Sequence, residues 1–183
     1  MRRRPNKRRG EGGFTLLEAM IAMVVLAFGL LSLVGVYTQG ILFAKMAQWD
    51  YIAQKKAEEA VETIFTARDT KLLTWAQIQN VSAGGVFLDG PAPLLDPGLD
   101  GLVGTGDDNA ALPDTVIIGP GPDKVLGTAD DEVVNLNGFM SRQIQISPVI
   151  NEPNLRQITV TILYQIGGKQ KTYTLISYIS AFA

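Results

Sequence analysis

The strongest constraint on this chain is an uncharged, mostly apolar run of about 26 residues, 19–44. Coiled as a helix, such a run is long enough to cross a lipid bilayer. One carboxylate, Glu18, stands immediately before it, and residues 13–18 read Gly-Phe-Thr-Leu-Leu-Glu. A charged side chain at the edge of hydrocarbon is costly and is normally kept together with a partner. The run therefore predicts a membrane helix, and Glu18 is its most informative residue.

The segment ahead of the run is strongly basic. Residues 1–13 carry six Arg and Lys residues against Glu11 alone, a net charge of +5, whereas the rest of the chain has ten basic and seventeen acidic residues, a net charge of −7. Positive charge just before a membrane helix holds that end in the cytoplasm. We therefore expect a single-pass protein with a cytoplasmic N-terminus. A basic cluster can also bind nucleic acid, but the acidic body argues against a nucleic-acid partner.

The order of these features is the reverse of that in a secretory signal. The small residues Gly12 and Gly13 precede the apolar run, so cleavage after Gly13 would leave the helix on the mature chain, beginning at Phe14. Residues 13–18 resemble the prepilin signature of type IV pilins and type II secretion pseudopilins. The continuation to residue 31 is most similar to minor pilins of the PilV type.

This resemblance implies how the chain is processed and assembled. A prepilin peptidase would cut between Gly13 and Phe14, and Phe14 would become an N-methylated N-terminus. Glu18 would meet the N-terminal amine of a neighbouring subunit as the helices pack into a fibre. The partners would be the peptidase, other pilins or pseudopilins, the inner-membrane assembly machinery and the membrane. The expected location is the bacterial inner membrane and, after assembly, a periplasmic or extracellular fibre.

Two plainer interpretations stay open for this segment. Glu18 can simply suit the positive end of the helix dipole, and the whole run can be an ordinary single-pass anchor.

The chain after the run has the pattern of one α+β head domain. Over residues 45–66 apolar residues recur every three or four positions, which predicts that the helix continues and packs one stripe on the head. Three later stretches, 139–147, 155–166 and 169–180, alternate as strands do, and Gly167-Gly168 marks a tight hairpin. We therefore predict a long N-terminal helix packed on a small C-terminal antiparallel sheet. The predicted parts are a leader at 1–13, a transmembrane and assembly helix at 14–44 and a head at 45–183.

Residues 82–137 are rich in Gly, Pro and Asp, which is typical of an acidic surface insertion. Two segments in it share the frame Gly-x-Asp-x-x-x-Gly-Thr-x-Asp-Asp: a first repeat at residues 98–108 and a second repeat at residues 121–131. Calcium takes several oxygen ligands, and glycines let the backbone turn so that carbonyl groups can join them. One interpretation is therefore one or two calcium sites formed by Asp100, Asp107, Asp108, Asp123, Asp130 and Asp131. The other is two Asp-Gly turns joined by an extended segment at 114–118.

Composition argues against catalysis. The sequence contains neither histidine nor cysteine, so it lacks the commonest general base and every Ser-His-Asp or Cys-His arrangement. We predict that the chain is not an enzyme and requires no cofactor, with calcium as the one candidate ion. The predicted function is a minor pilin-like or pseudopilin subunit of a type IV pilus or a type II secretion pseudopilus. The alternatives are a membrane-anchored, calcium-dependent binding or cell-adhesion module and, more remotely, an anchored enzyme.

Overall fold

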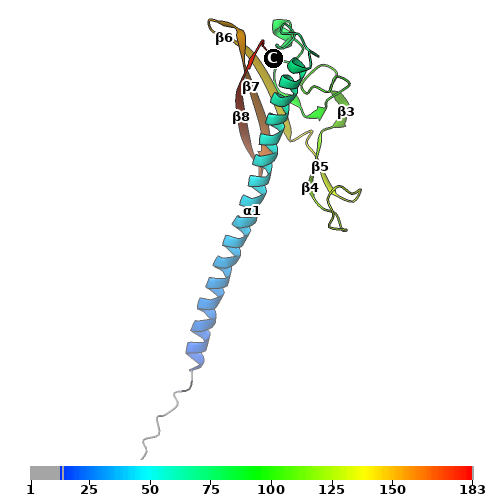
Figure 1. Ribbon diagram of the computed structural model, residues 1–183. Helices are drawn as coiled ribbons and strands as arrows, with labels where there is room; N and C mark the ends of the chain where they lie inside the picture. Colours follow the sequence, from blue (N-terminus) through cyan, green and yellow to red (C-terminus); the bar gives the residue numbers. More distant parts are fainter. Residues whose placement is uncertain (1–12, 14, 183) are drawn as a thin grey trace, which may run out of the picture. The chain divides into compact units, whose positions relative to one another are not determined.

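The computed structural model describes residues 13 and 15–182 (Figure 1). The basic leader and Phe14 therefore lie outside the described residues. The chain falls into two compact units, Met1–Lys45 and Met46–Ala183, and each is considered by itself below. The second unit is called the head.

Helix α1, Leu16–Asp69, contributes to both units and is continuous over its 54 residues. Gly29, Gly35 and Gly40 lie inside it without interrupting it, although each costs about 1 kcal/mol of helix propensity relative to alanine. The predicted continuation of the apolar run into an amphipathic helix is confirmed.

The head contains a four-stranded antiparallel sheet with the order β1-β6-β7-β8. Its strands are β1 (Ala92–Pro93), β6 (Met140–Val149), β7 (Glu152–Ile166) and β8 (Lys169–Ser180). Gly167 and Gly168, with φ of 57° and 78°, turn β7 back into β8, because glycine adopts positive φ without steric cost. The three predicted C-terminal strands are confirmed, and the two-residue edge strand β1 adds to them.

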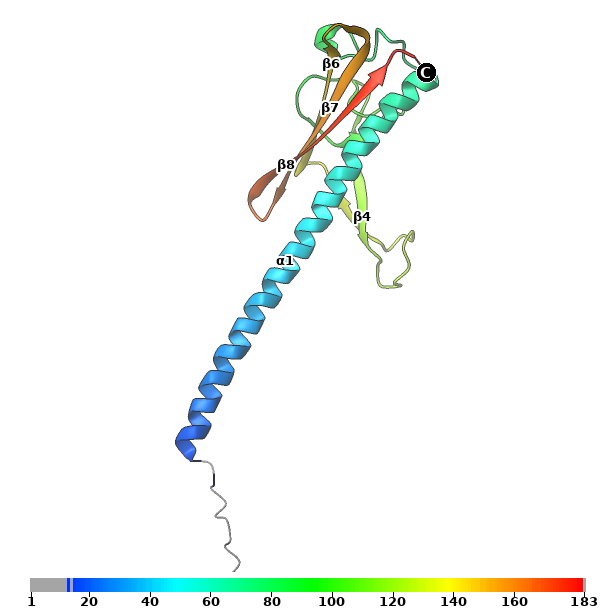
Figure 2. The same cartoon turned by 60° about the vertical axis from the view of Figure 1, so that its left-hand side comes forward.

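The core of the head lies between this sheet and the C-terminal part of α1, which runs across one face of the sheet (Figure 2). The buried stripe of the helix has the expected three- and four-residue spacing, and three of its members, Ala53, Ala57 and Ala60, are fully buried. Small side chains here let the helix approach the sheet closely. Opposite them lie alternate residues of the strands, including Ile158, Val160 and Ile162. Burying each such aliphatic side chain contributes about 1.5–3 kcal/mol. The α+β architecture is therefore as predicted.

Between α1 and β6 the chain forms a short 3₁₀ helix, Val81–Ala83, and two small hairpins. The first hairpin pairs β2 (Leu95–Asp96) with β3 (Asn109–Pro113), and the second pairs β4 (Thr115–Gly119) with β5 (Glu132–Asn135). The first repeat closes the first hairpin and the second repeat closes the second. The segment that joins the two repeats, expected to be extended, forms most of β4.

Candidate functional site

The start of α1 is held by a side-chain cap. The backbone N–H of Glu18 donates to Oγ1 of Thr15 at 3.3 Å and to its carbonyl oxygen at 3.1 Å. Such a cap satisfies one of the amide groups that a helix N-terminus leaves free. Sequence reasoning missed this role of Thr15, although the Thr-x-x-Glu spacing is the capping-box pattern. The cap fixes where the helix begins and places Glu18 in its first turn.

The Glu18 side chain is exposed, and within the described residues no hydrogen bond or ion pair engages its carboxylate. Glu18 lies in the first turn, at the positive end of the helix dipole, where an acidic residue stabilises a helix. Gly13 is also exposed, whereas Phe14, its partner across the predicted cleavage bond, lies outside the described residues. The predictions for Gly13, Phe14 and Glu18 stay predictions.

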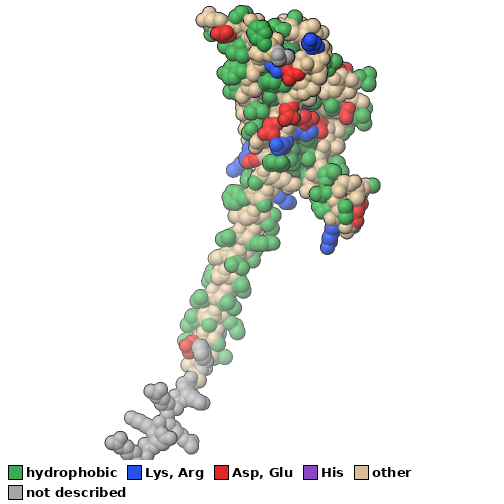
Figure 3. Space-filling view, in the orientation of Figure 1, with side chains coloured by type: hydrophobic (Ala, Val, Ile, Leu, Met, Phe, Trp, Pro, Cys, Tyr) green, Lys and Arg blue, Asp and Glu red, His purple; other side chains and the backbone are tan. Residues whose placement is uncertain are grey.

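The part of α1 that follows Glu18 presents an apolar surface on all sides. No described residue between 16 and 45 is buried, and hydrophobic side chains cover this length of the helix (Figure 3). The hydroxyls of Ser32 and Thr38 donate to the helix carbonyls of Phe28 and Val34, both at 2.9 Å, so their polarity is satisfied within the helix. This segment is long and apolar enough to span a membrane.

The six candidate aspartates of the two repeats hold their own loops together. In the first repeat Oδ1 of Asp100 accepts the N–H of Leu102 at 2.7 Å, and Oδ2 of Asp107 accepts the N–H of Asp100 at 3.2 Å. Oδ2 of Asp108 accepts the N–H of Gly104 at 2.8 Å. Hydrogen bonds that a backbone N–H donates to an aspartate carboxylate a few residues away are a common way to stabilise a turn.

The second repeat has the same bonds at the equivalent positions. Asp123 accepts from the N–H of Val125 at 2.8 Å, Asp130 from the N–H of Asp123 at 3.2 Å, and Asp131 from the N–H of Gly127 at 2.6 Å. The repeats also share a positive φ at their fourth residue, 69° at Gly101 and 60° at Lys124. The sequence repeat is therefore also a structural repeat.

The first glycine of the frame has a steric role in both copies. A Cβ at Gly98 would come within 2.4 Å of the backbone oxygen of Asp107, and one at Gly121 within 2.0 Å of that of Asp130. Only glycine allows this approach of the two ends of the loop.

These hydrogen bonds bear on the predicted calcium sites. Across the described part of the chain, no group of three or more Asp, Glu, His or Cys side chains is arranged to hold a metal ion. Backbone N–H groups and threonine hydroxyls occupy oxygens that an ion would need. As arranged, the aspartates fit two Asp-Gly turns better than an ion cage. Calcium binding stays a prediction, and calorimetric titration of the chain with calcium tests it, because absence of heat would exclude it.

Electrostatic attraction to a buried arginine helps to hold the first repeat on the head. Arg142 of β6 is 3% exposed, and burial lowers the pKa of its guanidinium. The charges of Glu59, Asp108 and Asp114 oppose that effect. Burial raises the pKa of Asp108, although Asp108 accepts hydrogen bonds from the first repeat and lies in the field of Arg142. The first repeat therefore contributes one carboxylate to a partly buried charge cluster around Arg142.

Lys56 of α1 completes this cluster. Its Nζ lies 2.6 Å from a carboxylate oxygen of Asp114 and 2.8 Å from one of Glu59. Burial alone would lower the pKa of Lys56, but these two contacts leave it raised. The helix, the sheet and the connection between the two hairpins are thus joined through charged groups.

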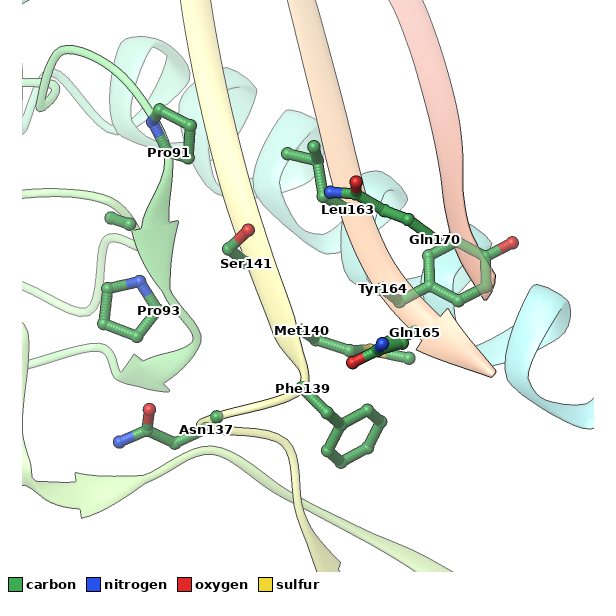
Figure 4. A pocket seen from close by; sticks show the side chains of 12 residues that line it. Pro91, Pro93, Asn137, Phe139, Met140, Ser141, Leu163, Tyr164, Gln165 and Gln170 are labelled. Atoms are coloured by element: carbon green, nitrogen blue, oxygen red, sulfur yellow. The ribbon is translucent and has the colours of Figure 1, made fainter. Parts of the chain in front are cut away.

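The head also has an open pocket of about 630 Å³ at the start of β6. Figure 4 shows Pro91 and Pro93 on one side of it and the strands of the sheet on the other, with Tyr164 and Gln170 among the lining side chains. The polar groups in its wall are uncharged. No nucleophile lies beside a base there, so the pocket has none of the geometry of an active site.

Comparison with known proteins finds one family model. Residues 8–34 match the prokaryotic N-terminal methylation motif, which covers the predicted cleavage position, Glu18 and the first part of α1. No curated protein and no solved structure matches the chain significantly. The motif and the long apolar helix agree with each other and indicate a structural subunit anchored in a membrane. In this motif and the apolar helix that follows it, the chain is similar to type IV prepilins.

Proposed function

We propose that the chain is a minor pilin-like or pseudopilin subunit that assembles into a fibre through the N-terminal part of α1. In this proposal prepilin peptidase cuts between Gly13 and Phe14, Phe14 is N-methylated, and Glu18 pairs with the N-terminal amine of a neighbouring subunit. The head then lies on the periplasmic or extracellular side. The observation that carries the proposal is the methylation motif at residues 8–34.

The described part of α1 supports this role physically. An apolar helix without a buried residue between 16 and 45 needs a lipid or protein environment to cover it. The exposed carboxylate of Glu18 enters that environment at a cost unless a cation meets it. A free N-terminal amine on an adjacent helix supplies that cation at the same depth. Pairing of the two charges would therefore fix the axial position of one subunit against the next.

Glu18→Ala tests the proposal in a bacterium that makes the whole assembly. We expect the variant to reach the membrane and to lose its leader normally, while its amount in the fibre fraction falls at least tenfold. Glu62→Ala is the matched control, because it removes an exposed carboxylate from the same helix within the head. Incorporation of Glu18→Ala at the wild-type level would contradict the proposal.

Leader processing separates this function from a membrane-anchored binding module. Gly13→Leu places a large side chain next to the bond to be cut. A fibre subunit should then accumulate uncleaved and stay out of the fibre, whereas an anchored adhesin would keep its surface binding with the leader still attached.

A further inference from the structure

The two repeats are alike in their internal bonds but differ in their surroundings. In the first repeat the apolar pair Leu102 and Val103 is 3% and 1% exposed, and Val103 belongs to the hydrophobic core of the head. The equivalent pair in the second repeat, Val125 and Leu126, is 56% and 65% exposed. The same loop is therefore docked in one copy and undocked in the other.

The contacts of the second glycine of the frame show the same contrast. A Cβ added to Gly104 of the first repeat would lie 2.8 Å from Cδ1 of Ile144. The carbonyl oxygen of Gly104 accepts a hydrogen bond from the N–H of Leu88 at 2.8 Å. At Gly127, the equivalent position, a Cβ would meet no described atom within 4 Å. The second repeat thus has the same loop conformation as the first, but no described surface of its own head packs against it.

The second hairpin extends the exposed apolar surface beyond the loop. Ile117 of β4 and Val133 of β5 are paired across the hairpin and are 48% and 54% exposed. In Figure 1 this hairpin projects away from the four-stranded sheet with the second repeat at its tip. Four exposed aliphatic side chains on one small hairpin are more than scattered surface residues require.

We propose that the second repeat is a docking loop that inserts Val125 and Leu126 into the head of a different subunit of the same assembly, at an apolar socket beside an arginine or lysine. The inference rests on the proposed function, which supplies the neighbouring subunits.

The first repeat defines the chemistry of that socket. On its own head it meets the aliphatic side chain of Ile144 and places Asp108 in the field of Arg142. Asp131 is the equivalent of Asp108, and the second repeat carries three aspartates against Lys124 alone. A receiving surface with a basic residue next to an apolar cavity therefore complements the loop in charge as well as in shape.

A second copy of this chain fits the loop less well. Its equivalent socket is already filled by its own first repeat, and the open pocket of about 630 Å³ near β1 has no lysine or arginine in its wall. The chain beyond residue 13 also carries a net charge of −7, so two heads repel each other. The partner is therefore a different chain.

Site-specific photo-cross-linking tests the proposal with the full chain in cells that make the whole assembly. The probe is benzoylphenylalanine at position 126, and the control is the same probe at Ile150, which is 87% exposed in the turn between β6 and β7. We expect position 126 to cross-link to another chain that has an N-terminal methylation motif, through a peptide containing Arg or Lys, at least tenfold more than position 150 does. Asp131→Asn, which keeps an acceptor for Gly127 but removes the charge, should lower that yield several-fold.

Adducts with a second copy of this chain, adducts with lipid alone, equal yields at positions 126 and 150, or no adduct would each overturn the proposal. N-terminal mass analysis and fibre incorporation are measured on the same samples. A cleaved, incorporated chain that does not cross-link at position 126 would refute the docking loop and leave the proposed function standing, whereas an uncleaved chain would count against the function itself.

Discussion

At the scale of single residues, Arg142 shows how this head accommodates charge. Its Nη1 is buried and, among the described residues, has no hydrogen-bond partner, so its stabilisation comes from the carboxylates around it. A buried guanidinium is tolerated in these surroundings because the negative charges of Glu59, Asp108 and Asp114 offset the cost of its burial. The cluster is therefore expected to matter more for stability than the exposed ion pairs of the helix.

We predict that Arg142→Ala lowers the free energy of unfolding by about 3 kcal/mol. The loss combines the removal of a positive charge near Asp108, which Lys56 does not contact, with the cavity left by a long buried side chain. Denaturant unfolding of the full chain in detergent, followed by the fluorescence of Trp49 and Trp75, measures it. Lys55→Ala is the control, since Lys55 contacts Glu58 on an exposed face, and its loss should have a much smaller effect on stability. Equal effects of the two substitutions would contradict the role given to Arg142.

Asp50 provides a pH-dependent contribution near the start of β6, where Tyr164 of β7 pairs with Met140. It accepts hydrogen bonds from Tyr164 at 2.8 Å and from Lys171 at 2.9 Å. Burial alone would raise the pKa of Asp50, but these bonds and the Lys171 charge leave it lowered. Burial, together with the bond to Asp50, raises the pKa of Tyr164 to about 12, so the phenol remains a donor at neutral pH.

The pKa of Asp50 is lower in the folded state than in the unfolded state. Its ionised carboxylate therefore contributes fully to the free energy of unfolding above the unfolded pKa of about 3.9, and this contribution is lost as pH falls through the folded pKa. The side chain is 46% exposed, so the contribution is less than about 1 kcal/mol. We predict that Asp50→Asn destabilises the head at pH 7 and has little effect at pH 2. Denaturant midpoints of both proteins at the two pH values check this, and an equal loss at both would be inconsistent with it.

At the scale of elements, periodicity predicted the helix and the three long strands because each buries one face. The stripe of α1 and the alternation in β7 are the marks of that burial in the sequence. The hairpins β2-β3 and β4-β5 left no such pattern, because their strands are short and mostly exposed. The repeat was visible in the sequence. That only the first copy is buried was not, because its burial depends on Ile144 and Arg142, which lie far away in the chain.

The two repeats provide a matched pair of substitutions. We predict that Val103→Ala lowers the free energy of unfolding by about 2 kcal/mol, since it removes buried methyl groups from the core. The larger truncation Leu126→Ala, in the equivalent loop, should cost less than about 0.5 kcal/mol because that side chain is exposed. Similar losses in denaturant unfolding would mean that the second repeat is also docked on its own head.

At the scale of the whole molecule, the chain combines an uncovered apolar helix segment with a head that has its own core. The segment predicts how the protein is processed and held in a membrane, and both predictions rest on residues 13–18 and the charges around them. The surfaces proposed to receive Glu18 and the second repeat belong to other molecules, so this sequence does not identify which subunit supplies either of them. Both belong to the assembly rather than to the isolated chain.

The central claim is that this chain is processed as a prepilin before it functions. The most direct test is mass analysis of the N-terminus of the chain purified from the cells that make it. We predict a mature chain that begins at Phe14 and carries one methyl group on its N-terminal amine. A chain that still begins at Met1 in the assembled fraction would contradict the account.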